Sequence, residues 1–267
     1  MTVLTETKLT AFPKHLLRDR VAIVTGGSRG IGRATVQRLA EAGAHVVVNY
    51  LSHTKDAGEA VREVKEHGGR SLAIQADVSK SREAAALIEK TLDEFGRLDL
   101  LVANAGIWEG APVEHMSDDI WDRVLDCNLR GTWTVCRAAV PAFKSNGGGS
   151  IIIVSSTAGQ RGEAGYSNYA ASKGGQISFA KSLSTELAPK IRVNVVAPGW
   201  VDTELNDVVF SGEENEEEKR KAIEAIPLKR LALAEDVANA IVFLGSDWAR
   251  HITGEVLNIN GGSVLCG

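Results

Sequence analysis

The sequence predicts a single α/β domain in which a doubly wound parallel sheet of about seven strands carries helices on both faces. Three observations predict this fold class. Short apolar runs alternate with segments of helical periodicity, the crossovers between successive strands contain a dozen or more residues, and no linker-like stretch divides the 267 residues. Because parallel strands need long crossovers and antiparallel hairpins do not, the parallel arrangement is favoured.

The expected strands are short apolar runs of the kind that buried parallel strands show. They cover residues 21–24, 45–49, 71–76, 98–103, 150–155, 191–197 and 255–259. The expected helices cover residues 31–42, 54–67, 80–95, 117–144, 166–188 and 234–245. A mixed polar stretch at residues 1–19 is expected to form an arm that precedes the domain of residues 20–267.

Composition limits the function classes. With 44% hydrophobic residues the chain can bury a large core, and its net charge of −4 gives no reason to expect a nucleic acid or an anionic membrane as partner. No apolar run approaches the length of a membrane span, and the beginning of the sequence lacks a signal-peptide core. Cys127, Cys136 and Cys266 have neither disulfide-framework nor zinc spacing, so we expect a reducing cytoplasm and no metal site.

A glycine-rich turn, Thr25-Gly26-Gly27-Ser28-Arg29-Gly30-Ile31-Gly32, joins the first expected strand to the first expected helix. In a dinucleotide site of the Rossmann type, Gly26 permits the tight turn, Gly30 lets the backbone approach a pyrophosphate and Gly32 allows close helix packing. The helix N-terminus then offers unpaired amides to phosphates. The glycine spacing differs from Gly-x-Gly-x-x-Gly, so the match is to the mechanism, and an ordinary glycine loop is the alternative.

Tyr169 and Lys173 are four residues apart in an expected helix and therefore lie on the same face. An ammonium held beside a phenol stabilises the phenolate, so we expect Lys173 to lower the pKa of Tyr169 toward neutrality. Two solvated residues on an exposed helix are the alternative for an isolated pair of this kind. Ser156, Asn128 and the glycine-rich turn favour a catalytic pair.

These motifs together resemble those of the short-chain dehydrogenase/reductase family, and the resemblance extends from Arg20 to Gly262. It rests on the turn from Thr25 to Gly32 and, in order along the chain, on Asp77-Val78, Asn104-Ala105-Gly106, Asn128, Ser156, Tyr169, Lys173 and Pro198-Gly199. Within the family the chain looks most like bacterial 3-oxoacyl-[acyl-carrier-protein] reductases, with glucose 1-dehydrogenases as near neighbours. An NAD(P)-dependent oxidoreductase acting on CH–OH groups is the implied activity.

The resemblance implies four catalytic residues. Tyr169 would exchange a proton with the substrate oxygen, Lys173 would lower its pKa and bind the cofactor ribose, and Ser156 would polarise the carbonyl. Asn128 resembles the family asparagine that holds a water linking the lysine to solvent. Ser155 and Tyr166 are weaker candidates, because Ser155 would face the other side of its strand and Tyr166 has no lysine four residues later.

The resemblance also implies the cofactor-binding residues. They are Gly26, Ser28, Arg29, Gly30, Ile31, Gly32, Asn49, Asp77, Val78, Asn104, Ala105, Gly106, Tyr169, Lys173, Pro198, Gly199, Val201 and Thr203. Asp77 and Val78 would flank the adenine, although Asp77 alone would equally suit the cap of the following helix.

NADP(H) is the favoured cofactor. No carboxylate follows the second expected strand, where NAD-selective enzymes place one on the ribose 2′-hydroxyl. Arg29 matches the family's basic position for the 2′-phosphate, and a charge-assisted contact would form there. Leu51 stands where similar sequences often have a basic residue, so NAD(H) use stays open.

The resemblance implies a small carbonyl compound or alcohol as substrate, and an acyl carrier protein as partner has little support from charge. Such a partner is acidic, whereas Glu213, Glu214 and Glu216–Glu218 make residues 212–220 acidic. The candidate basic residues are Arg130, Arg137, Lys144, Lys190 and Arg192, which no pattern places on one face. Trp108 and Trp200 are candidate pocket residues that suit a ring or sugar as well as an acyl chain.

Two alternatives to acyl reduction stay open: a glucose or polyol dehydrogenase, and a nucleotide-binding protein without catalysis.

The resemblance implies a substrate lid at about residues 203–226, within which the charged segment at 212–220 suits a solvated helix. It also implies a homotetramer built on the helices near 117–144 and 166–188. Apolar residues on those helices would support it, or would simply pack on the sheet: Ala138, Ala139, Val140, Phe143, Ile177, Ala180, Leu183 and Leu187.

Overall fold

The computed structural model of the chain describes residues 12–13, 15–204 and 216–265 and confirms the predicted fold class. A seven-stranded sheet has the order β3-β2-β1-β4-β5-β6-β9, and every neighbouring pair in it is parallel. Its strands are β1 (Val21–Val24), β2 (His45–Tyr50), β3 (Ser71–Gln75), β4 (Leu100–Ala103), β5 (Gly149–Val154), β6 (Ile191–Pro198) and β9 (Val256–Ile259). Because the strand order reverses between β1 and β4, the carboxyl ends of these strands border a crevice of the kind in which such sheets bind ligands.

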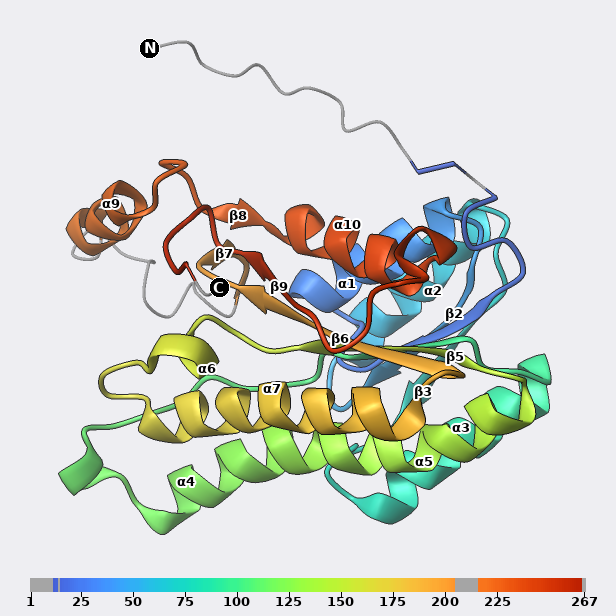
Figure 1. Ribbon diagram of the computed structural model, residues 1–267, viewed down its shortest axis with the longest axis horizontal. Helices are drawn as coiled ribbons and strands as arrows, with labels where there is room; N and C mark the ends of the chain where they lie inside the picture. The colour runs from blue at the N-terminus through green and yellow to red at the C-terminus, as the bar shows by residue number, and fades with distance from the viewer. Residues whose placement is uncertain (1–11, 14, 205–215, 266–267) are drawn as a thin grey trace, which may run out of the picture.

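Helices cover both faces of the sheet (Figure 1). One layer contains α1 (Gly30–Glu41), α2 (Thr54–Glu66) and α10 (Ala234–Gly245), and the other contains α3 (Ser81–Phe95), α4 (Asp118–Val124), α5 (Gly131–Ser145) and α7 (Ser167–Leu187). Alternate residues of each strand enter the two cores, so that Ile23 packs in one and Val24 in the other. This two-sided burial explains why the strands appear in the sequence as continuous apolar runs.

The expected helix over 117–144 is wrong in detail, because a π-helical segment at Leu125–Arg130 separates α4 from α5. Ser117 caps α4 by accepting a hydrogen bond from the amide of Ile120 at 3.3 Å. π-Helical turns insert one residue into the helical register and occur frequently at functional sites. Here the turn contains Asn128, which is fully buried.

Five small elements among the described residues lie outside the predicted set, two of which are short 3-10 helices, η1 (Val113–His115) and η4 (Asp247–Ala249). Strands β7 (Val201–Asp202) and β8 (Ala232–Leu233) pair in parallel, and α6 (Ala158–Arg161) follows β5. The helix predicted for the charged segment is present from its first described residue as α9 (Glu216–Ala225). Residues 205–215, which hold half of the expected lid and part of the acidic run, lie outside the described residues, as do 1–11 of the expected arm and Cys266. Of the helices that the structure describes, none has the length and apolar character that crossing a bilayer requires.

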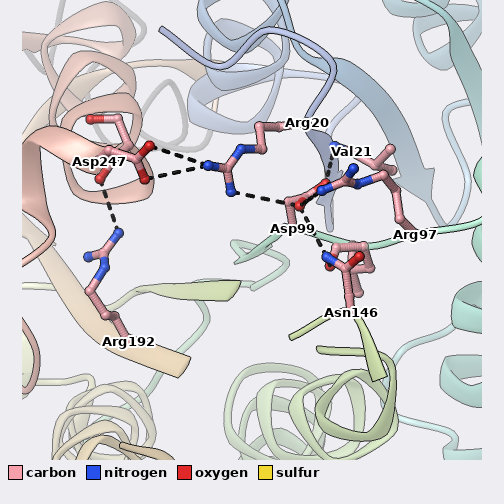
Figure 2. Close-up of polar contacts among 9 residues, drawn as sticks. Arg20, Val21, Arg97, Asp99, Asn146, Arg192 and Asp247 are labelled. Carbon is pink, nitrogen blue, oxygen red and sulfur yellow. Dashed lines mark hydrogen bonds and ion pairs between the residues drawn. The ribbon is translucent and has the colours of Figure 1, made fainter. Parts of the chain in front are cut away.

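A buried carboxylate, Asp99, ties together the amino end of the sheet (Figure 2). Its oxygens accept from the amide of Val21 at 2.9 Å and from the Arg97 guanidinium at 2.7 and 2.8 Å. Asn146, before β5, donates to it at 3.2 Å, and Arg20 connects it to Asp247. The segments that precede β1, β4 and β5 therefore share one acceptor.

We expect Asp99→Ala to lower the free energy of unfolding by about 2–3 kcal/mol, because it leaves the buried Val21 amide without its acceptor and the Arg97 guanidinium without its partner. Denaturant titration measures the change. Asp247→Ala is the matched control: its side chain is 79% exposed, so removing its contacts with Arg20 and Arg192 is expected to cost less than about 1 kcal/mol. Equal losses in the two variants would contradict a special role for Asp99.

Candidate active site

The carboxyl ends of the strands surround a cavity of about 320 Å³. It brings together nearly all of the predicted site residues: Gly26, Ser28, Arg29, Gly30, Ile31, Gly32, Asn49, Asp77, Val78, Asn104, Ala105, Gly106, Ser156, Tyr169, Lys173, Pro198, Gly199, Val201 and Thr203. Most of these residues lie at the carboxyl ends of six strands or in the segments that follow them, and parallel strands point all of those ends to the same edge. Tyr169 and Lys173 come from α7. Asn128 is buried away from the cavity and bonds to Ile107, which lines it.

The glycine turn is shaped as its sequence predicts. Gly26 has φ +62° and Gly30 has φ +53°, conformations that side chains other than glycine rarely adopt. A Cβ on Gly32 would strike the carbonyl oxygen of Gly26, so α1 can pack this close to the turn only with glycine there. The turn thus forms a cradle into which the free amides at the N-terminus of α1 point, and this fits a dinucleotide pyrophosphate.

Thr25 and Asn104 hold the cradle against the loop after β4. The Thr25 hydroxyl accepts from the amides of Asn104 at 2.9 Å and Ala105 at 3.0 Å, and the Asn104 side chain donates to the Thr25 carbonyl at 2.9 Å. Thr25 was not predicted as a site residue. Its hydroxyl fixes the distance between two cofactor-binding loops, which is a role that a linear motif does not display.

Two polar residues on the adenine side of the cavity are held by local hydrogen bonds. The Asn49 side chain donates to the carbonyls of Ile74 at 3.3 Å and Ala76 at 3.0 Å, which fixes the ends of β2 and β3. Asp77 accepts from the amide and hydroxyl of Ser79 at 2.9 and 2.7 Å. The alternative of Asp77 as a helix cap is therefore wrong, since Lys80 occupies the N-cap position of α3 and Asp77 forms an Asx turn before it.

Arg29 and Arg33 lie near the same end of the cavity but differ in their partners. Arg33 forms a bidentate pair with Glu63 at 2.5 and 2.9 Å, and this bond raises the pKa of the arginine and lowers that of the carboxyl. Arg29 is exposed and lines the cavity. Arg29 therefore offers its guanidinium to a ligand, while the charge of Arg33 is neutralised within the protein.

The proton-transfer residues meet where β5 ends and α7 begins. The Lys173 ammonium donates to the carbonyl of Val154 at 2.8 Å and lies 5.6 Å from the centre of the Tyr169 ring. Ser156 hydrogen-bonds the Tyr169 side chain, and its hydroxyl also accepts from the amide of Ala158 at 3.1 Å. A carbonyl oxygen between Ser156 and Tyr169 would meet two hydroxyl donors.

The expected direction of the Tyr169 pKa shift is wrong. Burial raises the pKa of Tyr169 to about 12, the Ser156 hydrogen bond opposes that rise, and the charge of Glu163 adds to it. Burial also lowers the pKa of Lys173 to about 8. The physical reason is that a low-dielectric site disfavours the charged form of both groups, which a pattern of residue types does not reveal. Tyr169 is therefore protonated at neutral pH.

Asn128 positions the elements around the lysine. Its side chain accepts from the amide of Ile107 at 2.8 Å and donates to the Ile107 carbonyl at 3.0 Å and to Ser172 at 3.1 Å. Its backbone carbonyl accepts from Gln176 at 2.9 Å. The π-helical turn is thereby joined to the loop after β4 and to α7; the expected water contact stays a prediction.

The neighbouring candidates have other roles. Ser155 donates to the backbone carbonyl of Lys173 at 2.8 Å, so it holds α7 against the end of β5. Tyr166 occupies the N-cap position of α7 and stacks on Trp108 with ring centroids 4.4 Å apart. Burial raises the pKa of Cys127, which argues against a reactive thiolate beside Asn128.

The far end of the cavity is aromatic and carries a carboxylate. Trp108 and Trp200 line it as predicted, with Trp200 edge-on to Trp108 at 5.8 Å. Glu163 and Arg161 also line it and were missed by the sequence analysis. They belong to a segment without periodicity between Ser156 and Tyr169, and their composition alone does not separate them from an exposed turn.

A glycine cradle at a helix N-terminus and a serine, tyrosine and lysine gathered in one cavity define a nicotinamide-dependent oxidoreductase that acts on a CH–OH or carbonyl group. A family model described as "Enoyl-(Acyl carrier protein) reductase" matches residues 26–263. The chain belongs to the short-chain dehydrogenase/reductase family, which confirms the resemblance found in the sequence.

Named relatives match along nearly the whole chain. A 3-oxoacyl-[acyl-carrier-protein] reductase FabG of Staphylococcus aureus (strain N315) is 41% identical over 245 residues, which are 91% of this chain and 98% of the relative. A 3-oxoacyl-[acyl-carrier-protein] reductase of Synechocystis sp. is 40% identical over 251 residues, 93% of this chain and 98% of the relative. A FabG of Chlamydia trachomatis is 39% identical over 250 residues, 92% and 98%.

We expect the buried ammonium to make stability depend on pH. The pKa of Lys173 is lowered to about 8 in the folded chain, so above pH 8 the unfolded chain binds the extra proton and stability rises with pH until the unfolded lysine also titrates. Relative to Lys173→Met, wild type should gain about 2 kcal/mol between pH 7 and pH 10. Denaturant titrations of both proteins at each pH measure the difference, and a constant difference would contradict a charged, buried lysine.

Proposed function

We propose that the chain is an NADP(H)-dependent reductase of 3-oxoacyl thioesters. The observation that carries the proposal is the gathering of Ser156, Tyr169 and Lys173 at one end of a cavity whose other end is the glycine cradle. The names of the relatives support the substrate class, since those at 39–41% identity are 3-oxoacyl-[acyl-carrier-protein] reductases. A nucleotide-binding protein without catalysis is not favoured, because all three reacting side chains are intact and adjacent.

In the proposed mechanism, Tyr169 donates a proton to the substrate oxygen as negative charge develops there. Its pKa of about 12 keeps it protonated, and the Ser156 hydroxyl beside it polarises and orients the carbonyl. The nicotinamide supplies the hydride when bound. The Lys173 ammonium lies 5.6 Å from the centre of the Tyr169 ring, where it stabilises the phenolate left after proton transfer. The lysine pKa of about 8 keeps the ammonium largely protonated at neutral pH.

The preference for NADP(H) rests on Arg29 and on the end of β2. Tyr50, Leu51, Ser52 and His53 line the cavity there and none of them carries the carboxylate that would repel a 2′-phosphate. Arg29 would form a charge-assisted bond with that phosphate. NAD(H) stays the alternative, since a single exposed arginine discriminates only modestly between NADP(H) and NAD(H).

An acyl carrier protein as the thioester carrier is supported by the names of the relatives more than by charge. Of the basic residues considered, Arg192 donates to Ser246 at the amino end of the sheet, opposite the cavity. Arg137 lies over the Trp133 ring at 4.4 Å, and Arg130 lies 4.0 Å from Asp126. A glucose or polyol dehydrogenase is the second candidate, favoured by the tryptophans and the carboxylate at the far end of the cavity.

A homotetramer completes the proposal. Of the apolar residues named for the interface, Ala139, Phe143, Ala180 and Leu187 are buried within the chain, and their part is explained by packing on the sheet. Ala138, Val140, Ile177 and Leu183 are partly exposed, and Trp133 beside them is 39% exposed. Covering this surface by symmetric association would remove apolar area from water. The lid expected at about residues 203–226 stays a prediction, since residues 205–215 lie outside the described residues.

We expect NADPH consumption with 3-oxobutanoyl-N-acetylcysteamine, and a loss of at least about a hundredfold in kcat for Tyr169→Phe, because the variant lacks the proton donor. Fluorescence titration with NADPH should give the same affinity within a few fold, which separates lost chemistry from lost folding. Turnover of glucose with NADP, without turnover of the thioester, would replace the acyl substrate by a polyol. Tyr169→Phe with full activity would contradict the assigned proton donor.

The same assay run with NADH measures the cofactor preference. We expect kcat/KM to be at least about tenfold higher with NADPH, and Arg29→Ser to reduce that ratio by lowering the NADPH value alone. Equal values for the two cofactors in wild type would overturn the preference and leave the rest of the proposal intact.

A further inference from the structure

The far end of the cavity is built by two loops that are clamped together. One follows β4 and carries Trp108 and Gly110; the other precedes α7 and carries Glu163 and Tyr166. Trp108 stacks on Tyr166 with an interplanar angle of 15°, and a Cβ on Gly110 would come within 2.5 Å of the Tyr166 ring. The two loops therefore touch through backbone and ring, and this leaves little freedom for the side chains between them.

Glu163 is held in this clamp. It lies between Gly162 at φ +82° and Gly165 at φ +77°, and its backbone carbonyl accepts from the amide of Tyr166 at 3.1 Å. The Trp108 indole hydrogen-bonds its carboxylate, and burial raises the pKa of the carboxyl. A carboxylate has about four lone-pair positions, so Glu163 keeps acceptor capacity toward the cavity that it lines.

The ligand facing Glu163 is the substrate rather than the cofactor. Glu163 and Tyr169, the proton donor, line the same cavity, and the charge of Glu163 raises the pKa of the tyrosine. The cofactor phosphates belong to the glycine cradle, where a second negative charge would repel them. A part of the substrate a few atoms from the reacting carbonyl would therefore meet a carboxylate set among indole rings.

We propose that Glu163 is a specificity-determining residue that accepts a hydrogen bond from an N–H or O–H group on the substrate beyond its carbonyl. Trp108 and Trp200 contact the apolar part of the same substrate. In a 3-oxoacyl thioester the donor is the amide N–H of the thiol arm, and in a polyol it is a hydroxyl. The inference rests on the proposed function and adds which substrates that function selects.

The preference for substrates with a hydrogen-bond donor follows from the partial burial of the Glu163 carboxylate. A partly buried carboxylate loses hydration, and a donor on the substrate replaces part of it. A substrate without a donor leaves the carboxylate with the Trp108 indole and the charge of Arg161 as its partners within the protein, and sites built to bind a polar group discriminate strongly against analogues that lack one. Substrates with a donor should therefore be preferred, and the preference should disappear with the carboxylate.

The test compares matched substrates on wild type, Glu163→Leu and Glu163→Gln with saturating NADPH. 3-Oxobutanoyl-N-acetylcysteamine carries an amide N–H, whereas the S-butyl thioester of the same acid has none. We expect the ratio of their kcat/KM values to fall at least about tenfold in Glu163→Leu, and by less in Glu163→Gln, which keeps an acceptor oxygen. Glucose and cyclohexanol, assayed with NADP, form the matched pair for a hydroxyl donor.

Two further variants test whether the selection depends on the Glu163 carboxylate and on its bond to Trp108. Trp108→Phe keeps an aromatic ring and removes the indole N–H, so it should lower the same ratio by a smaller factor if Trp108 positions the carboxylate. Glu89→Gln, on the exposed side of α3, is the control for loss of a carboxylate and should leave every ratio unchanged. Unaltered NADPH affinity in fluorescence titrations establishes that the variants are folded.

The outcomes are distinguishable. A fall in the thioester ratio supports the amide donor, and a fall in the alcohol ratio alone supports the hydroxyl donor and moves the substrate to the polyols. Unchanged ratios in Glu163→Leu, with good turnover by wild type, overturn the inference and leave the proposed function standing. Wild type that turns over none of the four substrates overturns both.

Discussion

The site depends on one buried cation. The Lys173 ammonium lies in the low-dielectric space between α7 and β5, where its bond to the Val154 carbonyl replaces water. Ser155, from the end of the same strand, donates in turn to the backbone carbonyl of Lys173, so two hydrogen bonds fix α7 on the sheet. Tyr169 lies one turn earlier on that helix, and its position relative to Ser156 is therefore set by the anchoring of the lysine.

The amino end of the sheet contains hydrogen bonds that stabilise the fold, and the carboxyl end contains the cavity with the reacting side chains. At the amino end, Asp99 accepts from the buried Val21 amide of β1 and from Arg97 and Asn146, which precede β4 and β5, and none of these residues lines the cavity (Figure 2). At the carboxyl end, polar groups such as Thr25 and Asn128 form hydrogen bonds between loops and helices that border the cavity. Because the stabilising contacts of Asp99 lie at the opposite end of the sheet, the burial that shifts the pKa of Tyr169 and Lys173 does not disturb them.

The layers of the fold were predictable because buried parallel strands leave continuous apolar runs and covering helices leave a 3.6-residue period. The glycine cradle was predictable because Gly26, Gly30 and Gly32 answer backbone constraints that no other residue meets. The π-helical turn was not, since one inserted residue hardly changes the apolar period. Glu163 was missed because its significance comes from Trp108, which lies far away in sequence. The direction of the Tyr169 shift was wrong because desolvation depends on packing that the sequence does not display.

The geometry predicts that a nicotinamide dinucleotide binds across the carboxyl ends of the strands. Hydrogen–deuterium exchange with and without saturating NADPH tests it most directly. Exchange should slow at residues 25–32, 76–79, 104–108 and 198–203, which line the cavity or hold its loops, and stay unchanged at 97–99 and 146–149 beside Asp99. Protection confined to the amino end of the sheet, or its absence from the glycine turn when NADPH is bound, would contradict the account.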